Sequence, residues 1–322
     1  MKYFPRLVSK KLSPLFSTRK LLAAKTPPFL PFYHTVSNKP LPHILNYPVI
    51  DEKQFKQELD FYLKYFKPIS LEELTKSPKP KSFHISFDDG LKECAEIVAP
   101  ILIQKGIPAS FFVNSGFVDN KELFHRYKAS LIANKMRTQP DAEAENYLNE
   151  NEVPLKDLLQ APFSKQEILD HAAELLEIDF QSFLETQKPY MTTSQIKDLH
   201  NKGFSIGGHS HKHPEFRKIS QKKQLKEIKK SMKWVEENVN PKVKAFSFPF
   251  TDDGVSTNLI KKIHDSEICD ISFGTAGVKY DEIPNHFQRY PAEQAGDLEL
   301  NVKAEFLYFK LRKTIGKVTV KH

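Results

Sequence analysis

Cysteine and long apolar runs are both scarce in this chain, and each shortage excludes a class of protein. Only two cysteines occur in 322 residues, Cys94 and Cys269, and their spacing fits neither a metal site nor a redox pair. A secreted disulfide scaffold would carry more, so we expect both thiols to be reduced and inert. No window approaches the ~18 uninterrupted apolar residues that a membrane-spanning helix needs. With 39% hydrophobic residues, the sequence predicts a soluble globular protein with one large domain or two small ones.

Acidic residues are absent from the first fifty positions, which hold eight Lys or Arg, while residues 303–322 hold six basic residues and one Glu. The net charge of +8 therefore lies at the two ends, and the middle of the chain is mildly acidic. This distribution argues against nucleic-acid binding by the body of the protein. We interpret the ends first as solvated termini, with peripheral contact between them and an anionic membrane as the alternative.

A continuous apolar stretch is also missing from the N-terminus, because basic residues interrupt each hydrophobic run. This argues against a secretory signal peptide. The segment is basic, free of acids and contains serine, a composition shared by transit peptides and by plain cytoplasmic N-termini. We favour a cytoplasmic protein, with residues 1–28 as a basic N-terminal extension and residues 303–322 as a basic C-terminal tail.

Short apolar runs alternate with helical patterns along residues 29–302. Such alternation predicts a parallel sheet, and the number of units predicts an α/β fold in the form of a distorted (β/α) barrel of about seven strands. The expected strands are 29–34, 83–87, 109–113, 204–208, 245–250, 269–273 and 286–290, and the expected helices are 52–66, 91–104, 220–239 and 255–264.

One stretch interrupts this alternation, because no glycine occurs between Gly116 and Gly203. Its residues are rich in Glu, Lys, Leu and Ala, which favour helices. We therefore expect a helical insertion at residues 117–190. In a barrel such an insertion would lie over one rim, where loops commonly determine specificity.

The sequence Phe87-Asp88-Asp89-Gly90 places two carboxylates directly after an apolar strand. Neighbouring side chains of an extended strand point to opposite faces, so both can address one site only if the chain turns there. Gly90 allows such a turn. One carboxylate could then bind a cation while the other acts as a base. Because Asp-Asp-Gly recurs at residues 252–254, at least one copy could be only a turn.

The second polar element is His209-Ser210-His211-Lys212-His213, which also follows an apolar strand. His209 and His213 share a face if the chain makes one helical turn, and two imidazoles spaced this way commonly bind one metal ion. An extended chain would instead pair His211 with either neighbour. A polar loop without metal is the competing interpretation.

Taken together, the two elements predict a hydrolytic centre. Both follow strands, and the carboxyl ends of barrel strands meet at one rim. One carboxylate and two histidines form a facial set of ligands that leaves positions open for water and substrate. Zinc is the default metal for such a set.

At this point the chain resembles the polysaccharide deacetylases with a NodB-homology domain (carbohydrate esterase family four). The first family motif, Thr/Ser-Phe-Asp-Asp-Gly, stands here at residues 86–90, and the second, His-Ser/Thr-x-x-His-Pro, stands at residues 209–214. The third, usually Arg-x-Pro-Tyr, is altered to Ser-Phe-Pro-Phe at residues 247–250. The resemblance covers roughly residues 30–114 and 190–291, and it implies a NodB-like barrel, a carbohydrate substrate and hydrolysis of an N-acetyl group.

The resemblance also implies roles for single residues. Asp89, His209 and His213 would bind the divalent metal, and Asp88 would be the catalytic base that takes a proton from the attacking water. The backbone N–H near Phe250 would donate to the oxyanion. Ser210 would orient the histidine loop by hydrogen bonding.

Two departures from the family pattern affect the predicted chemistry. Ser247 replaces the arginine that normally contacts the base, and no clear Leu-x-His motif supplies the general acid. His286 precedes the last expected strand, which places it at the opposite rim. His34 ends the first strand on the correct rim and is our candidate catalytic acid, with a buried structural histidine as the alternative. Arg289 could also reach the site, but we give it no role.

Three functions follow from these residues. The leading one is a metal-dependent hydrolase that removes N-acetyl groups from a carbohydrate, with a surface-polysaccharide or glycan precursor as the expected substrate. The second is a metal-dependent amidohydrolase acting on a non-sugar amide. The third is a catalytically silent homologue that binds carbohydrate or membrane. The altered third motif and the missing late histidine motivate the last two.

Overall fold

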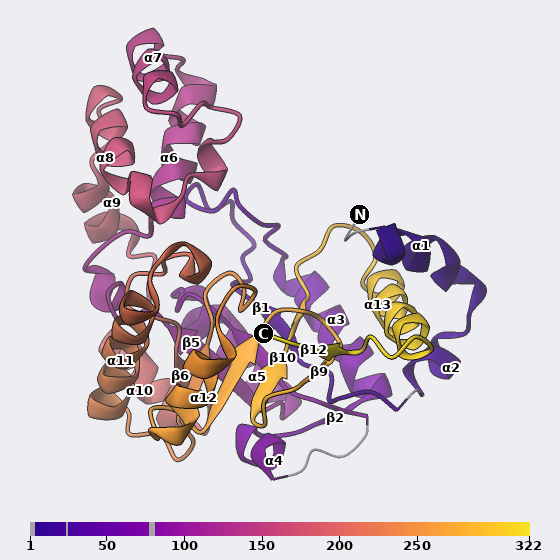
Figure 1. The fold of residues 1–322 in the computed structure, drawn as a ribbon. Helices are drawn as coiled ribbons and strands as arrows, with labels where there is room; N and C mark the ends of the chain where they lie inside the picture. The colour runs from indigo at the N-terminus through magenta and orange to yellow at the C-terminus, as the bar shows by residue number, and fades with distance from the viewer. Residues whose placement is uncertain (1–3, 24, 77–80) are drawn as a thin grey trace.

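The computed structural model describes residues 4–23, 25–76 and 81–322. Its centre is a sheet of eight strands in which every pairing between neighbours is parallel (Figure 1). Along the chain these strands are β1 (Pro31–Tyr33), β4 (Ile85–Phe87), β5 (Ala109–Val113), β6 (Ser205–Gly208), β7 (Ala245–Ser247), β8 (Ile271–Gly274), β10 (His286–Gln288) and β11 (Tyr290–Pro291). The spatial order is β10-β8-β7-β6-β5-β4-β1-β11.

The two edge strands of this sheet, β10 and β11, are consecutive in the chain and are separated only by Arg289. The sheet therefore curls until its edges lie next to each other, which gives a nearly closed barrel and confirms the predicted fold class. The count is eight strands rather than about seven because Arg289 divides the last expected strand into two.

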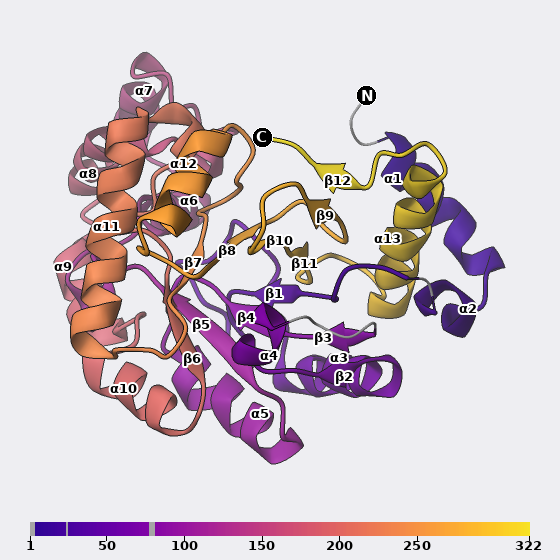
Figure 2. The same cartoon turned by 60° about the horizontal axis from the view of Figure 1, so that its bottom comes forward.

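Helices cover the outside of the barrel (Figure 2). They are α3 (Glu52–Tyr65), α5 (Ala99–Lys105), α10 (Thr193–Asn201), α11 (Gln221–Asn238) and α12 (Thr257–Asp265). Side-chain caps fix several of their first turns, as where Asp51 accepts the Gln54 N–H at 2.7 Å and where Ser220 caps α11. The expected helix at 91–104 begins with a π-helical turn, η2 (Cys94–Val98), before α5. Both cysteines are buried and free.

Short elements complete the barrel. They are α4 (Leu71–Thr75), the paired strands β2 (Lys67–Pro68) and β3 (Ser82–Phe83), and the 3₁₀ turns η3 (Val118–Asn120) and η6 (Phe216–Lys218). None of the helices in the described part of the chain is long and apolar enough to cross a membrane.

The helical insertion expected at 117–190 is present and builds its own small core. Its helices are α6 (His125–Thr138), α7 (Ala142–Glu150), α8 (Gln166–Leu175) and α9 (Phe180–Gln187), with the 3₁₀ turns η4 (Leu158–Gln160) and η5 (Phe163–Lys165). Ile132, Leu148 and Leu169 are among the residues that form its separate apolar cluster. The insertion connects β5 to α10 and projects from the barrel at the upper left of Figure 1.

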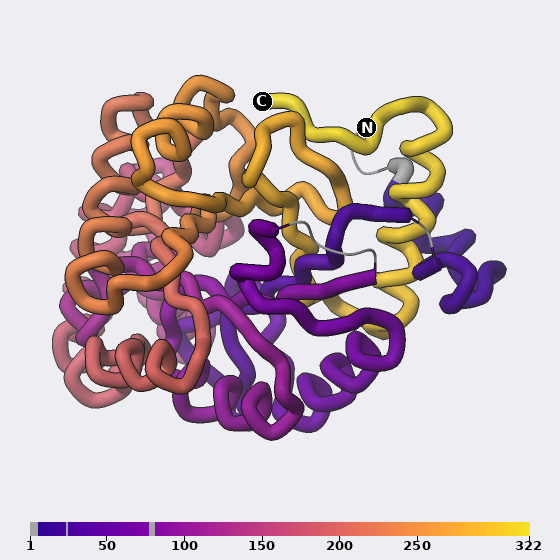
Figure 3. Tube along the Cα trace, turned by 90° about the horizontal axis from the view of Figure 1, so that it is seen from below, coloured from indigo at the N-terminus to yellow at the C-terminus, as the bar shows by residue number. Residues whose placement is uncertain are grey.

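The two basic ends of the chain pack against each other. The helices α1 (Phe4–Leu12) and α2 (Thr18–Leu22), joined by η1 (Ser13–Leu15), lie along α13 (Leu298–Lys313), as Figure 3 also shows. The expected boundary at residue 302 falls inside α13. Val302, Phe306 and Phe309 of this helix belong to the main apolar core, so much of the basic tail is anchored on the barrel.

The last residues return to the barrel wall. Strand β12 (Thr319–Val320) pairs with β9 (Tyr280–Asp281) in a parallel register (Figure 1), and the His322 ring centre lies 5.2 Å from that of His286 in β10. The side chain of the terminal residue, His322, is thereby buried next to β9 and β10.

Candidate active site

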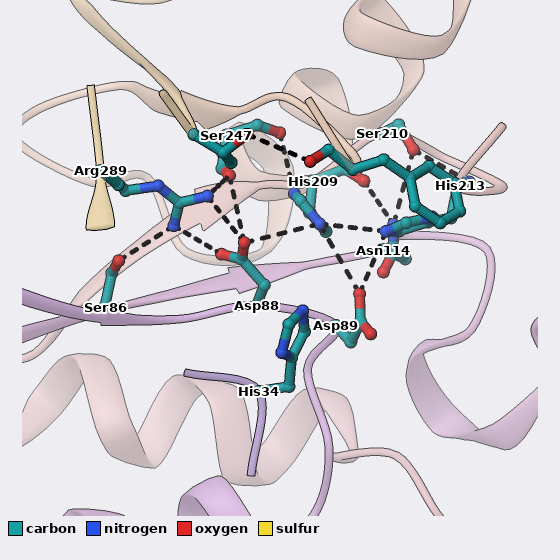
Figure 4. Close-up of polar contacts among 12 residues, drawn as sticks. His34, Ser86, Asp88, Asp89, Asn114, His209, Ser210, His213, Ser247 and Arg289 are labelled. Carbon is teal, nitrogen blue, oxygen red and sulfur yellow. Dashed lines mark hydrogen bonds and ion pairs between the residues drawn. The ribbon is translucent and has the colours of Figure 1, made fainter. Parts of the chain in front are cut away.

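The residues named from the sequence converge at the carboxyl ends of the barrel strands (Figure 4). His34 follows β1, Asp88 and Asp89 follow β4, and His209 follows β6. These residues line a cleft of about 240 Å³, together with His213, Phe250 and side chains of the insertion. The parallel sheet brings segments more than one hundred residues apart to one rim, as expected for a barrel.

Asp89, His209 and His213 form the centre of this cleft. Asp89 Oδ1 lies 3.2 Å from His213 Nε2 and 3.6 Å from His209 Nε2, and the two Nε2 atoms are 3.1 Å apart. All three side chains are buried. Among the described residues, no donor meets Asp89 Oδ1 in hydrogen-bond geometry, although the atom is fully buried. A buried carboxylate oxygen facing two imidazole nitrogens is a donor set that fits a divalent cation.

The backbone at this centre is unusual, because Asp89, Ser210, His213 and Phe250 all have φ between +53° and +69°. Non-glycine residues adopt this left-handed conformation at a cost of roughly 1–2 kcal/mol each, and such positions concentrate at functional sites. The turn that aims both aspartates at the cleft occurs at Asp89 itself. Gly90 also has positive φ, and a Cβ there would lie 3.1 Å from Val113 Cγ1.

Hydrogen bonds hold the histidine loop in its shape. Ser210 Oγ accepts the His213 backbone N–H at 2.9 Å, in accord with the orienting contact expected of this serine. Asn114 Nδ2 donates to the His209 carbonyl. His211 points away from the centre and bonds Ser115 Oγ at 2.9 Å. The loop therefore presents its first and third histidines, as the helical-turn alternative expected, but it does so through left-handed residues at Ser210 and His213 rather than through a helical turn.

The tautomer of His209 follows from a backbone contact. Its Nδ1–H donates to the Ser247 carbonyl at 2.8 Å, which leaves Nε2 facing the cleft. Burial lowers the pKa of His209 to about 4. The ring is therefore neutral near pH 7 and has a lone pair available at Nε2.

Asp88 is held by Arg289, a residue that the sequence placed within reach of the site without a role. Arg289 donates to Asp88 Oδ1 at 2.8 Å and to Asp88 Oδ2 at 2.7 Å, which is a two-pronged contact. The guanidinium also bonds Ser86 Oγ at 3.0 Å and Ser247 Oγ at 2.5 Å. It lies 4.4 Å from the ring centre of Phe32. Arg289 is only 1% exposed, so this contact is shielded from water.

Several neighbouring groups determine the protonation of Asp88. Burial is the largest single influence and raises the pKa of Asp88, but the charge and hydrogen bonds of Arg289, joined by His209 and His34, together lower it by more, so the net pKa lies below its usual value. Ser247 stands where the resembling family carries arginine, and here it accepts a hydrogen bond from Arg289. A guanidinium from the closing edge of the barrel thus contacts the carboxylate.

His34 has a partner that sequence reasoning also missed. Its Nδ1 lies 2.5 Å from Glu293 Oε2, and its backbone N–H donates to Glu293 Oε1 at 2.8 Å. The ring stacks on Tyr47 with ring centres 4.2 Å apart. Burial lowers the pKa of His34, but the charge and hydrogen bond of Glu293, joined by the charges of Asp89 and Asp88, together outweigh it and raise the pKa to about 9. His286 does not line this cleft; it begins β10 and bonds Asp252 instead.

The insertion forms one wall of the cleft. Tyr127 OH donates to Asp89 Oδ2 at 3.0 Å, and the Phe124 ring centre lies 4.4 Å from that of His213. The Phe250 ring lies 4.5 Å from His213 on another side and is 39% exposed. Only the composition of the insertion was visible in the sequence, so these wall contacts could not be predicted.

Comparison with known proteins agrees with this geometry. A family model described as polysaccharide deacetylase matches residues 75–266, which is more than half of the chain. No curated protein matches the chain. The matched part contains Asp88, Asp89, His209, His213 and Phe250, whereas His34, Arg289 and Glu293 lie outside it.

Several solved structures share the fold at low sequence identity. The Streptococcus pyogenes deacetylase PplD in complex with acetate is 14% identical with a TM-score of 0.56, covering 88% of this chain and 99% of that chain. IcaB from Ammonifex degensii is 15% identical with a TM-score of 0.56, covering 88% and 97%. BC0361, a polysaccharide deacetylase from Bacillus cereus, is 14% identical with a TM-score of 0.52, covering 86% and 68%.

Proposed function

The chain belongs to the polysaccharide deacetylase family, and on that premise we propose that it removes N-acetyl groups from a carbohydrate with the aid of a divalent cation. Members of this family are hydrolases that deacetylate carbohydrate. The proposal rests on one observation above all: Asp89 Oδ1, His209 Nε2 and His213 Nε2 converge within 3.1–3.6 Å of one another beside the carboxylate of Asp88. This arrangement provides a cation site and a base in one cleft.

Asp89, His209 and His213 would hold the cation, and zinc is the metal that two imidazoles and one carboxylate favour. When bound, such a cation polarises a carbonyl and lowers the pKa of water. The orphaned Asp89 Oδ1 and the neutral His209 ring supply free electron pairs for it.

The remaining steps fall to groups of the chain itself. Asp88 is ionised and would take the proton of the attacking water. In the described part of the chain the Phe250 N–H makes no hydrogen bond, so it is available for the developing oxyanion. His34, which Glu293 keeps protonated, would deliver a proton to the leaving amine.

Arg289 and Glu293 bear on the two alternative functions. A silent homologue, or an amidohydrolase for another amide, was suggested by the altered third motif and by the missing late histidine. Arg289 contacts Asp88 as the missing arginine would. The pair of His34 and Glu293 supplies a protonated imidazole at the correct rim. Both observations favour an active enzyme.

The experiment is acetate release from N-acetylated oligosaccharides, measured together with the metal content of the protein. Asp88→Asn should abolish acetate release and retain metal, whereas His209→Ala should lose both. His211→Ala is the matched control, because this histidine stands in the same loop but points away from the cleft. Acetate release that survives both site substitutions would refute the proposal, and hydrolysis of small cyclic amides in preference to oligosaccharides would favour the non-sugar alternative.

The expected substrate is a surface-polysaccharide or glycan precursor, and the cytoplasmic location stays a prediction. A lipid-linked precursor would bring the enzyme to an anionic membrane. Leu7, Leu12, Leu15 and Phe16 are exposed around α1 and η1, and Lys10 and Lys11 stand in the last turn of α1. Exposed apolar groups mixed with lysines are typical of helices that lie on a membrane surface.

Liposome flotation with anionic lipid tests this contact. Because Phe306 and Phe309 are core residues, point substitutions are better than deletion of the ends. The double substitution Leu15→Glu and Phe16→Glu should abolish flotation. Ile103→Glu on α5 is the matched control, since Ile103 is also an exposed apolar residue. Flotation unaffected by the double substitution would remove the membrane contact while leaving the hydrolase proposal intact.

A further inference from the structure

A second group of metal-ligating side chains lies outside the cleft. It consists of Asp252 after β7, Asp281 in β9, His286 in β10 and the terminal His322, whose ligand atoms all lie within 4.8 Å of one another. His286 Nε2 is 3.1 Å from Asp252 Oδ2 and His322 Nε2 is 3.0 Å from Asp281 Oδ2. The third close pair, His322 Nε2 and Asp252 Oδ2, is 3.8 Å apart. These four side chains are at most 4% exposed.

Neighbouring residues hold these ligand atoms in place. Ser272 Oγ bonds His286 Nδ1 at 2.7 Å, which turns His286 Nε2 towards the carboxylates. Gln288 Nε2 donates to Asp252 Oδ2 at 2.5 Å and to Asp281 Oδ2 at 2.8 Å. Its Oε1 accepts the Ala276 N–H at 2.7 Å, so the amide orientation is determined. Metal-binding histidines and carboxylates are typically supported in this way.

The backbone also makes room for the group. A Cβ on Gly274 would overlap the Asp252 carboxylate, so only glycine at this position of β8 lets the carboxylate enter. The second Asp-Asp-Gly triplet of the sequence therefore contributes more than a turn, because its first aspartate is a buried member of this group.

We propose that Asp252, Asp281, His286 and His322 bind one divalent cation of the zinc type at a structural site. The distances of 3.0–3.8 Å between imidazole nitrogens and carboxylate oxygens match the 3.2–3.6 Å found in the cleft. Two carboxylate ligands match the charge of a divalent cation. Four protein ligands close the tetrahedral shell, which is characteristic of structural zinc, whereas the three ligands of the cleft leave a position open.

Such a cation would join three segments that are distant in the sequence, namely the loop after β7, the stretch from β9 to β10, and residue 322. It would fasten the C-terminal residue and β12 to the barrel wall, and it would anchor the loop after β7 two residues beyond Phe250. Because folding brings the ligands together, metal binding at this site would stabilise the folded state. The inference does not depend on the proposed catalytic activity.

The test counts metal in the full-length protein after zinc loading and dialysis. The wild type should hold about two zinc equivalents, and His213→Ala and His322→Gln should each hold about one. Gln at position 322 keeps a donor near the Asp281 carboxylate but offers a poor metal ligand, so it separates metal binding from a hydrogen bond. His171→Gln is the matched control, because His171 is an exposed histidine of the insertion that pairs with Glu174 and packs edge-on against Tyr147, far from either group of ligands in the sequence.

A second measurement reports the coordination directly. His213→Ala loaded with Co²⁺ should show the intense visible absorption of a tetrahedral cobalt site, and the added substitution His322→Gln should remove it. Zinc content equal in His322→Gln and wild type would overturn the proposal. Loss of all metal from His213→Ala would overturn it as well, since the second site would then bind nothing by itself.

Discussion

Replacing Arg289 by methionine should remove most of the deacetylase activity in mildly acidic solution while leaving the proposed cation site intact. Methionine keeps an unbranched stem beside Phe32 but cannot donate to Asp88, whose two oxygens accept from Arg289 at 2.8 and 2.7 Å. Arg289 makes no contact with Asp89, His209 or His213 that the structure records. Its loss should therefore affect the base and spare the metal ligands.

The size of the effect follows from burial. Asp88 is 2% exposed, and removing one partner of a buried ion pair costs about 3–5 kcal/mol because the other charge remains in the interior. The protein can avoid this cost by protonating Asp88, and each unit of pKa rise corresponds to about 1.4 kcal/mol. A rise of two to three such units, starting from a pKa below the usual value, would leave Asp88 largely protonated in mildly acidic solution but mostly ionised at pH 7.

The sign of the pH dependence is then determined. Only ionised Asp88 can act as a base, and a raised pKa depletes this form at every pH below the new value. The loss of kcat/KM should be deepest in acid and should shrink as the pH rises. General-base catalysis contributes about 10²–10⁴-fold, and because Asp88 would be largely protonated only in acid, we expect the loss to approach ~10² towards pH 5 and to be smaller near neutral pH. Arg289→Lys keeps the charge without the two-pronged contact and should lose less activity.

The assay is acetate release from pH 5 to 9 by the wild type, Arg289→Met and Arg289→Lys, with metal content and thermal unfolding measured on the same samples. Wild-type activity in Arg289→Met at all pH values would refute the reasoning. A loss that is equal at every pH and accompanied by loss of metal would also refute it, because the site would then have collapsed rather than lost its base.

Three further predictions concern other buried groups. If His34 is the acid, activity should fall as the pH rises through about 9, and Glu293→Gln should move this falling limb of the pH profile to lower pH. Burial lowers the pKa of His84 to about 4, so protonation of this histidine opposes folding. The free energy of unfolding in urea should therefore drop by up to about 3 kcal/mol between pH 7 and 4, and His84→Gln should make the unfolding free energy depend less on pH. Arg126 of the insertion bonds Glu215, beside the histidine loop, at 3.2 Å. Glu215→Gln should raise KM several-fold with metal content unchanged, because the wall of the cleft formed by the insertion would be displaced and would misposition the substrate. A falling limb that does not move in Glu293→Gln would contradict the first prediction. A pH dependence of stability equal in His84→Gln and wild type would contradict the second, and an unaltered KM in Glu215→Gln would contradict the third.

Local pattern was enough to predict the centre of the site. The strand preceding Asp88 and the strand preceding His209 could both be recognised from their apolar residues, and the carboxyl ends of parallel strands share one rim. This rule predicts that residues 88–89 and 209–213 lie together. The same reasoning placed His34 at the correct rim and His286 away from it. The helices of the insertion followed from its composition alone.

Partners defined by closure of the barrel were invisible to that reasoning. Arg289 contacts Asp88 only because β10 and β11 meet at the two edges of one sheet. Glu293 reaches His34 because β11 pairs with β1. No periodicity within a segment encodes such contacts, since they join residues about two hundred positions apart or more. For the same reason the packing of α1 on α13 could not be expected from two separately basic ends.

The sequence alone thus determined the chemical groups of this protein and the rim at which they gather, because residue order and strand pattern are local properties. The tertiary structure alone decided their electrostatics: which carboxylate is ionised, which imidazole carries a proton, and which histidines face the same carboxylate oxygen. These properties depend on burial and on charges within a few ångströms, and only the folded chain brings such neighbours together.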